Sequence, residues 1–119
     1  MAKFLFVYRN SAEIDKEFEN ASPEQMQEAM AKWGQWFQAV GSAIVDGGDG
    51  LLPTGKIVKG NTITDGPFIE AKELVGGYSI LEAENYEQAA ELATGCPIIE
   101  LGGTVEIREL AGYSVDSNG

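Results

Sequence analysis

The first residues of the chain alternate in a way that makes both faces of a strand apolar. The apolar side chains divide between the two faces: Phe4, Phe6 and Tyr8 on one, Leu5 and Val7 on the other. A strand with two apolar faces lies in the centre of a sheet or between two packed layers. Residues 3–9 are therefore predicted to form a strand that is covered on both sides.

Two segments have the spacing of amphipathic helices. Ser22 begins the first as an N-cap, Gln25 completes a capping box, and Gly41 ends it. The apolar stripe of this helix consists of Met26, Ala29, Met30, Trp33, Trp36, Phe37 and Val40. Asn85 caps the second helix in the same manner. Both helices are predicted to cover the sheet.

Shorter strand patterns occupy residues 43–45, 57–59, 62–64, 73–81 and 104–110. Gly60-Asn61 indicates a hairpin turn of two residues, and Gly76-Gly77 predicts a bulge or a close backbone approach. The glycine-rich residues 46–50 are predicted to be a loop, and residues 65–67, Asp-Gly-Pro, a second turn.

The predicted order is strand, helix, strand, hairpin, strand, helix, strand. This is the order of two β-α-β units around an inserted hairpin, which indicates an α+β, ferredoxin-like protomer. The helices of such a protomer cover one face of the sheet. Because the first strand is apolar on both faces, the other face needs a partner. We therefore predict a homodimer that packs sheet to sheet about a two-fold axis.

Length and composition restrict the chemistry. The 119 residues correspond to one domain, 1–119, with residues 113–119 expected to form a frayed tail. The chain has no histidine and one cysteine. It therefore cannot form a histidine-based catalytic group, an internal disulfide or a Cys/His zinc site. We expect no metal and no cofactor.

The charge restricts the partners. The net charge is −11, and the eight basic residues are scattered. Such a chain repels nucleic acids and anionic membranes, so we expect neither as a partner. No apolar run is long enough for a signal peptide or a membrane span. The lone Cys96, predicted to be a buried and inert thiol, fits a reducing compartment, and we expect the protein in the cytoplasm.

One segment resembles a known family. Residues 64–73, with the letters TDGPFIEAKE, followed by Gly76-Gly77-Tyr78, are similar to the DGPF branch of the YCII-related domain family. Further similarity lies at residues 33–36 (WGQW), 95–97 (GCP) and 105–108 (VEIR). The resemblance covers residues 3–110. It implies a dimeric α/β barrel built from ferredoxin-like protomers.

The resemblance also carries expectations about activity. A His–Asp pair is proposed as catalytic elsewhere in the family, and one branch is similar to a dehydrochlorinase. This chain has no histidine, so that pair cannot be carried over, and lyase-like chemistry would need other groups. Members of the branch are associated with sigma-factor-like regulators, which implies a protein partner as an alternative.

Several residues are candidates for a site. Asp65 either stabilises a turn or acts with Tyr78 in proton transfer within a barrel cleft. Arg9 either pairs with an acid or binds an anionic ligand. Trp33 and Trp36 are either anchors of the core or of an interface, or an aromatic wall for a planar ligand. The family-like motif adds three ligand-binding candidates, of which the last two alternatively form a surface ion pair: Phe68, Glu70 and Lys72.

Three functions are consistent with these residues. The first is a protein that binds a small molecule in the barrel cleft, with or without lyase-like activity. The second is a non-enzymatic dimeric module for a metabolite or a protein partner, and the third, by fold analogy alone, is a cofactor-free monooxygenase. A deep pocket around Asp65 without a charged neighbour would favour an enzyme. An exposed apolar patch would favour an interaction module.

Overall fold

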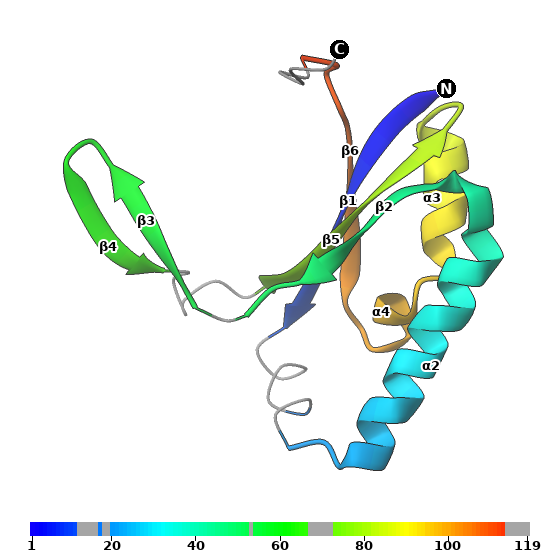
Figure 1. Cartoon of the computed structure of the whole chain (residues 1–119), viewed down its shortest axis with the longest axis horizontal. Coiled ribbons are helices and arrows are strands. Elements are labelled where there is room, and N and C mark those ends of the chain that lie inside the picture. Colours follow the sequence, from blue (N-terminus) through cyan, green and yellow to red (C-terminus); the bar gives the residue numbers. More distant parts are fainter. Residues whose placement is uncertain (12–16, 18–19, 53, 67–72, 114–119) are drawn as a thin grey trace.

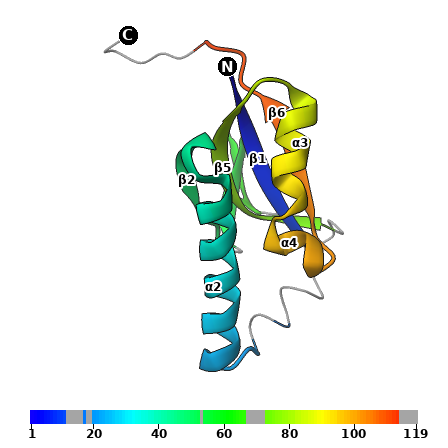
Figure 2. The ribbon, with the colours of Figure 1, turned by 90° about the vertical axis from the view of Figure 1, so that its right-hand side faces the viewer.

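The computed structural model describes residues 1–11, 17, 20–52, 54–66 and 73–113. Within them, a four-stranded sheet carries the helices on one face, and a separate hairpin projects on the other side (Figures 1 and 2). The strands are β1 (Ala2–Ser11), β2 (Ile44–Gly50), β3 (Gly55–Lys59), β4 (Thr62–Gly66), β5 (Glu73–Ala83) and β6 (Thr104–Glu109). The helices are α2 (Pro23–Val40), the short turn η1 (Gly41–Ala43), α3 (Tyr86–Thr94) and α4 (Pro97–Glu100).

The sheet has the strand order β2-β5-β1-β6, and all its neighbouring strands are antiparallel. This is the order that two interleaved β-α-β units produce. β3 and β4 pair with each other in a separate two-stranded sheet. The α+β class, the central position of the first strand and the inserted hairpin are thereby confirmed.

The predicted helix starts are confirmed in atomic detail. The Ser22 hydroxyl accepts a hydrogen bond from the Gln25 amide at 3.2 Å, and the Gln25 side chain accepts one from the Ser22 amide at 2.8 Å. The Asn85 side chain accepts a hydrogen bond from the Gln88 amide at 2.9 Å. These bonds satisfy backbone donors that have no partner inside a helix.

The apolar stripe of α2 is buried only in part. Trp36 and Val40 lie in the core, whereas Met26 and Met30 are exposed. The first half of α2 extends past the end of the sheet, as Figure 2 shows, so it has no sheet to cover. Helical spacing therefore predicted the ends of α2 and the face that is buried, but the buried part of that face is shorter than the predicted stripe.

Aromatic side chains fill the space between sheet and helices. Phe4, Phe6 and Tyr8 point from β1 towards the helices and are buried. The Trp36 ring lies within 6.5 Å of the rings of Phe6 and Tyr8, and its Nε1 donates a hydrogen bond to the Leu92 carbonyl at 2.9 Å. This bond links α2 to α3, so Trp36 is an anchor of the core.

Two consecutive hydrogen bonds between polar groups run through this core. The Tyr8 hydroxyl donates to the Ser79 hydroxyl at 2.8 Å, which in turn donates to the Gly47 carbonyl at 2.7 Å. Burial raises the pKa of Tyr8 well above its usual value, although the bond to Ser79 lowers it in part. The chain of bonds ties β1, β5 and β2 together and leaves the phenol protonated at neutral pH.

The glycine pair of β5 forms the predicted irregularity. Tyr8 pairs with Gly77 and Arg9 with Val75, so Gly76 is an extra residue in β5. A Cβ on Gly76 would lie 2.9 Å from the Asn10 side chain, and one on Gly77 2.9 Å from a carbonyl of β2. Both the bulge and the close backbone approach are confirmed.

Two segments differ from the sequence prediction. Residues 46–50 belong to β2 rather than to a loop, because Gly48, at φ +69°, lets β2 lie directly against Tyr78 of β5. Asp65 lies in β4 rather than in a turn. The hairpin ladder continues to Gly55 and Gly66, and Asp65 stands opposite Lys56.

Among the described residues no helix has the length and apolar character that crossing a bilayer requires.

Candidate functional site

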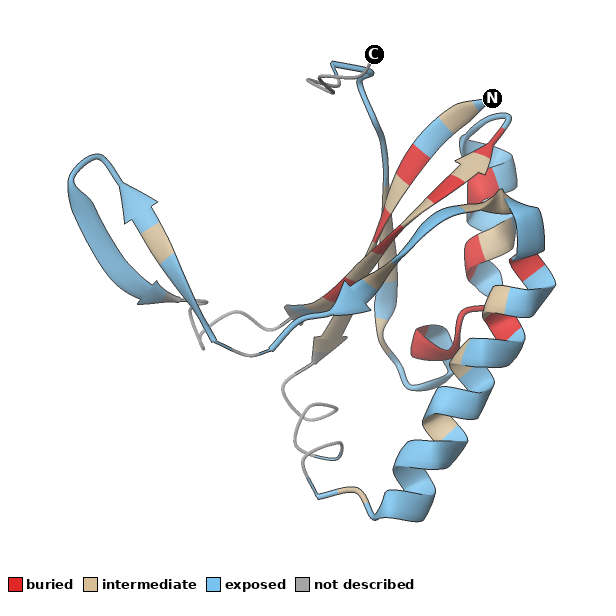
Figure 3. Ribbon diagram, viewed as in Figure 1, coloured by how far each residue is buried: buried red, intermediate tan, exposed pale blue. Residues whose placement is uncertain are grey.

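The face of the sheet away from the helices, which we call the open face, has an apolar centre and charged surroundings. Antiparallel partners share a face, so the ladders assign its residues. Its centre consists of Leu5, Val7, Tyr78 and Ile80, all half-buried by their neighbours. Its described charged residues are Lys3, Arg9, Asp46, Asp49, Glu82, Glu106 and Arg108. Figure 3 shows this side of the sheet free of helices.

Arg9 and Tyr78 both border Val7 on the open face. Tyr78 stands directly opposite Val7 on β5, and Arg9 lies two residues further along β1. The Arg9 guanidinium lies 3.1 Å from a Glu106 carboxylate oxygen, and its side chain is 31% exposed. A half-buried guanidinium at the edge of an apolar patch is a group that can bind a carboxylate. This arrangement is the candidate site.

Arg108 offers a comparison on the same face. It pairs with the other oxygen of Glu106 at 3.6 Å, but its side chain is 71% exposed. Ion pairs between exposed groups contribute little to stability or binding. Of the two arginines beside Glu106, Arg9 is therefore the one placed to hold a ligand.

Trp33 and Trp36 lie on the other side of the sheet. The Trp33 ring meets the rings of Tyr8 and Trp36 edge to face, at centroid distances of 4.8 and 5.9 Å. Since Tyr8 points towards the helices, neither tryptophan faces Arg9 or Tyr78. Within the chain they line no common site with the open-face residues.

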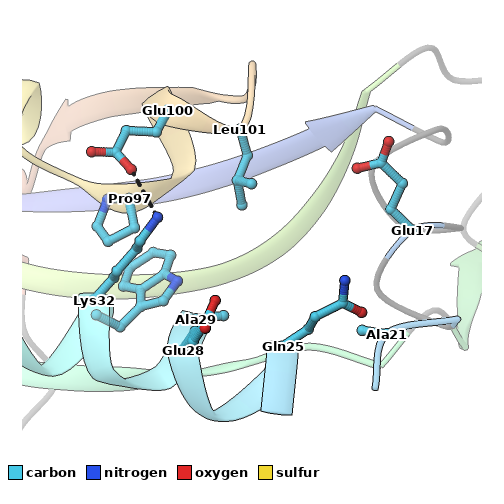
Figure 4. A pocket seen from close by; sticks show the side chains of 10 residues that line it. Glu17, Ala21, Gln25, Glu28, Ala29, Lys32, Pro97, Glu100 and Leu101 are labelled. Carbon is cyan, nitrogen blue, oxygen red and sulfur yellow. Dashed lines mark hydrogen bonds and ion pairs between the residues drawn. The ribbon is translucent and has the colours of Figure 1, made fainter. Parts of the chain in front are cut away.

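Trp33 instead borders a groove between α2 and α4 (Figure 4). Its volume is about 220 Å³, below the ~300–1,000 Å³ of pockets that hold drug-sized ligands. An ion pair between Lys32 and Glu100, at 3.5 Å, crosses it. The other lining residues are Glu17, Ala21, Gln25, Glu28, Ala29, Pro97 and Leu101.

No described set of three or more acidic, cysteine or histidine side chains is arranged to hold a metal ion.

Asp65 lies apart from both places. It is on the hairpin, where its carboxylate pairs with Lys56, and its side chain is 89% exposed. The hairpin stands away from the sheet in Figure 1, so Asp65 and Tyr78 are not brought together within one chain. The predicted candidates Phe68, Glu70 and Lys72 lie outside the described residues.

The sequence analysis missed two residues beside Arg9: one is its partner in the site, and the other is the exposed arginine outside it. Glu106, the partner of Arg9, and Arg108 belong to the last strand, where they alternate with the core residues Val105 and Ile107. This alternation was visible in the sequence. The position of β6 beside β1, which sets Glu106 next to Arg9, comes from the strand order.

Cys96 has the environment that the sequence predicted. It is a free, buried thiol before the first residue of α4. Burial raises the pKa of Cys96 to about 11, and a hydrogen bond with the Ile98 backbone lowers it in part. The thiol is therefore protonated at neutral pH and is a poor nucleophile.

One family model matches almost the whole of the described fold. The family model of the YCII-related domain matches residues 4–112, which includes every strand and helix described above except for the first two residues of β1. No curated protein matches the chain.

Proposed function

The chain belongs to the YCII-related domain family, and from that premise we propose that it is a homodimeric binding module. Two copies pack open face to open face, which completes a dimeric α/β barrel. A small carboxylic acid binds between the sheets, held by Arg9 and Tyr78. The motif at residues 64–73 supports placement in the DGPF branch of the family, and the unpaired Cys96 supports a reducing compartment such as the cytoplasm.

The observation that carries the proposal is the apolar centre of the open face. Leu5, Val7, Tyr78 and Ile80 form a continuous patch across β1 and β5, and no described helix covers it. Patches of this kind, surrounded by charged residues, are typical of interaction surfaces. A second copy fits because its own patch is the same and a two-fold axis sets the two against each other.

The enclosed guanidinium of Arg9 supports an anionic ligand on the open face. Three basic residues lie on this face with four acidic ones, and the acidic residues are Asp46, Asp49, Glu82 and Glu106. The whole chain has eight basic and nineteen acidic residues. The open face is therefore less acidic than the rest of the molecule, and Arg9 is its most enclosed cation that pairs with an acid.

The surroundings of Asp65 favour a binding module over a lyase. A general base needs a carboxylate that is partly desolvated and within reach of its substrate. Asp65 is instead exposed and neutralised by Lys56. Within one chain, the proton-transfer pair of Asp65 and Tyr78 is not assembled.

Small carboxylic acids should stabilise the protein through Arg9. At ~100 times its Kd a ligand adds ~2.7 kcal/mol, which raises the Tm of a domain of this size by several degrees. In a thermal-shift panel of small carboxylic acids, each beside its neutral amide, we expect an acid but not its amide to give this shift. Arg9→Gln should abolish the shift.

Arg108→Gln is the matched control. It removes the same charge from the same face and from the same partner, Glu106, but at an exposed position. The acid-induced shift should therefore persist in this variant. Equal shifts with acids and amides, or a full shift in Arg9→Gln, would contradict the assignment of Arg9.

A further inference from the structure

The hairpin formed by β3 and β4, residues 55–66, exposes an apolar pair that its own chain does not cover. We call this hairpin the arm. Val58 and Ile63 stand opposite each other, with exposed fractions of 68% and 66%. The Lys56–Asp65 ion pair lies on the same face of the ribbon, because residues two apart share a face. This face, with Lys56, Val58, Ile63 and Asp65, is the docking face.

A two-stranded ribbon of this length needs support. An isolated hairpin is at best marginally stable in water, and further stability comes from packing against another layer. Within the described residues, the arm's strands pair only with each other, and Figure 3 shows the arm exposed almost throughout. Such a hairpin therefore needs a second surface that covers the docking face.

Charge indicates what that surface is. The arm contains Lys56, Lys59 and one acid, Asp65, so its net charge is +1. The whole chain carries a net charge of −11, so the residues outside the arm carry −12. A segment with the opposite sign to its own body is attracted to any other copy of that body.

The reach of the arm fits the same partner. In Figure 1 the arm projects from the side of the sheet opposite to the helices, which is the side of the open face. A strand of five residues spans ~17 Å, whereas two sheets that pack face to face lie ~10 Å apart. In a sheet-to-sheet dimer each arm therefore extends past the midplane to the other copy.

We propose that the arm of each copy docks against the body of the second copy in the homodimer, with Val58 and Ile63 buried in the contact. This inference rests on the dimer proposed above and adds a second contact to it. It also places the Lys56–Asp65 pair at the interface. Asp65 thus contacts the second copy and forms no site with Arg9 and Tyr78 of its own chain.

Two isoleucines of β3 and β4 give a matched test. Ile63→Thr removes apolar surface from the docking face, and Ile57→Thr makes the same change on the opposite face of the ribbon, opposite Thr64. The dimer Kd, measured by sedimentation equilibrium, should rise about tenfold in Ile63→Thr, because most of a buried isoleucine's contribution is lost. Ile57→Thr should leave it within about twofold.

The charge of the arm gives an independent readout. Lys59→Glu changes the net charge of the arm from +1 to −1 without breaking the Lys56–Asp65 pair. Because Lys59 lies on the face of the ribbon opposite the docking face, this variant tests the long-range charge attraction and not the apolar contact. The dimer should weaken in this variant at low salt, and the difference should largely vanish at ~1 M salt, where charges are screened over ~3 Å.

The outcomes separate this proposal from the dimer itself. A wild-type chain that stays monomeric would overturn both. A wild-type dimer whose Kd is unchanged in Ile63→Thr and Lys59→Glu would overturn arm docking and leave the sheet-to-sheet dimer standing. Equal weakening by Ile63→Thr and Ile57→Thr would assign the effect to folding of the hairpin and would also overturn the docking face.

Discussion

Replacing Val7 with glutamate should give a folded protein that no longer dimerises. Val7 lies at the centre of the open face, between Tyr78 on one neighbouring strand and Glu106 on the other. In the dimer a carboxylate at this position would be buried beside Glu106, and the neighbouring guanidinium of Arg9 already pairs with Glu106. Burial of an unpaired charge costs several kcal/mol, and every ~1.4 kcal/mol is a factor of ten in Kd. We expect the dimer Kd to rise by at least about a hundredfold.

The fold should survive this change. In the monomer the side chain of residue 7 points away from the helices and reaches water, while Phe4, Phe6 and Tyr8 keep the core intact. Leu101→Glu is the control, because it adds the same charge on the helix side of the molecule. Its dimer should be unaffected. A dimer that persists in Val7→Glu, or dissociates equally in both variants, would contradict a sheet-to-sheet interface.

The second large effect is expected for Gly48→Ala. Gly48 has φ +69°, a conformation that costs an L-residue about 1 kcal/mol or more. A Cβ there would also overlap the carbonyl oxygen of Tyr78, so β2 would have to move off β5. Together these terms should destabilise the protein by about 3 kcal/mol and lower its Tm by roughly 10 °C or more.

Gly47→Ala is the adjacent control. Nothing lies within 4 Å of a Cβ built on Gly47, and its φ is not positive. Its substitution should change the free energy of unfolding by less than about 0.5 kcal/mol in urea denaturation. Similar losses in the two variants would mean that β2 does not lie against β5 as described.

Elements with local signals were predictable from the sequence. The capping box at Ser22, the cap at Asn85 and the turn at Gly60 each depend on residues within a few positions of one another. The bulge at Gly76 follows from the same kind of signal. Together these features predicted the order of elements, and that order predicted the sheet.

β2 and Asp65 were not predictable in the same way. Residues 46–50 have the composition of a loop, and only the ladder with β5 makes them a strand. An Asp-Gly-Pro sequence is typical of a turn, but the cross-strand partner Lys56 keeps Asp65 in β4. In both cases pairing with a distant segment outweighs local preference.

The candidate site was predictable only in part. Strand alternation places Arg9 on one face of β1 with Leu5 and Val7. Because both faces of β1 are apolar, the sequence does not show which of them the helices cover. The helices cover the face of Tyr8, which leaves Arg9 on the open face and separates it from Trp33 and Trp36. Only the packed structure provides this division.

The central claim is that a second copy covers the open face, and the mass of the unmodified protein in solution tests it most directly. Sedimentation equilibrium across micromolar to millimolar concentrations should give twice the chain mass of 12.8 kDa, approaching a single chain only on dilution. A mass of one chain at every concentration would contradict the account, since Leu5, Val7, Tyr78 and Ile80 would then face water in the working protein.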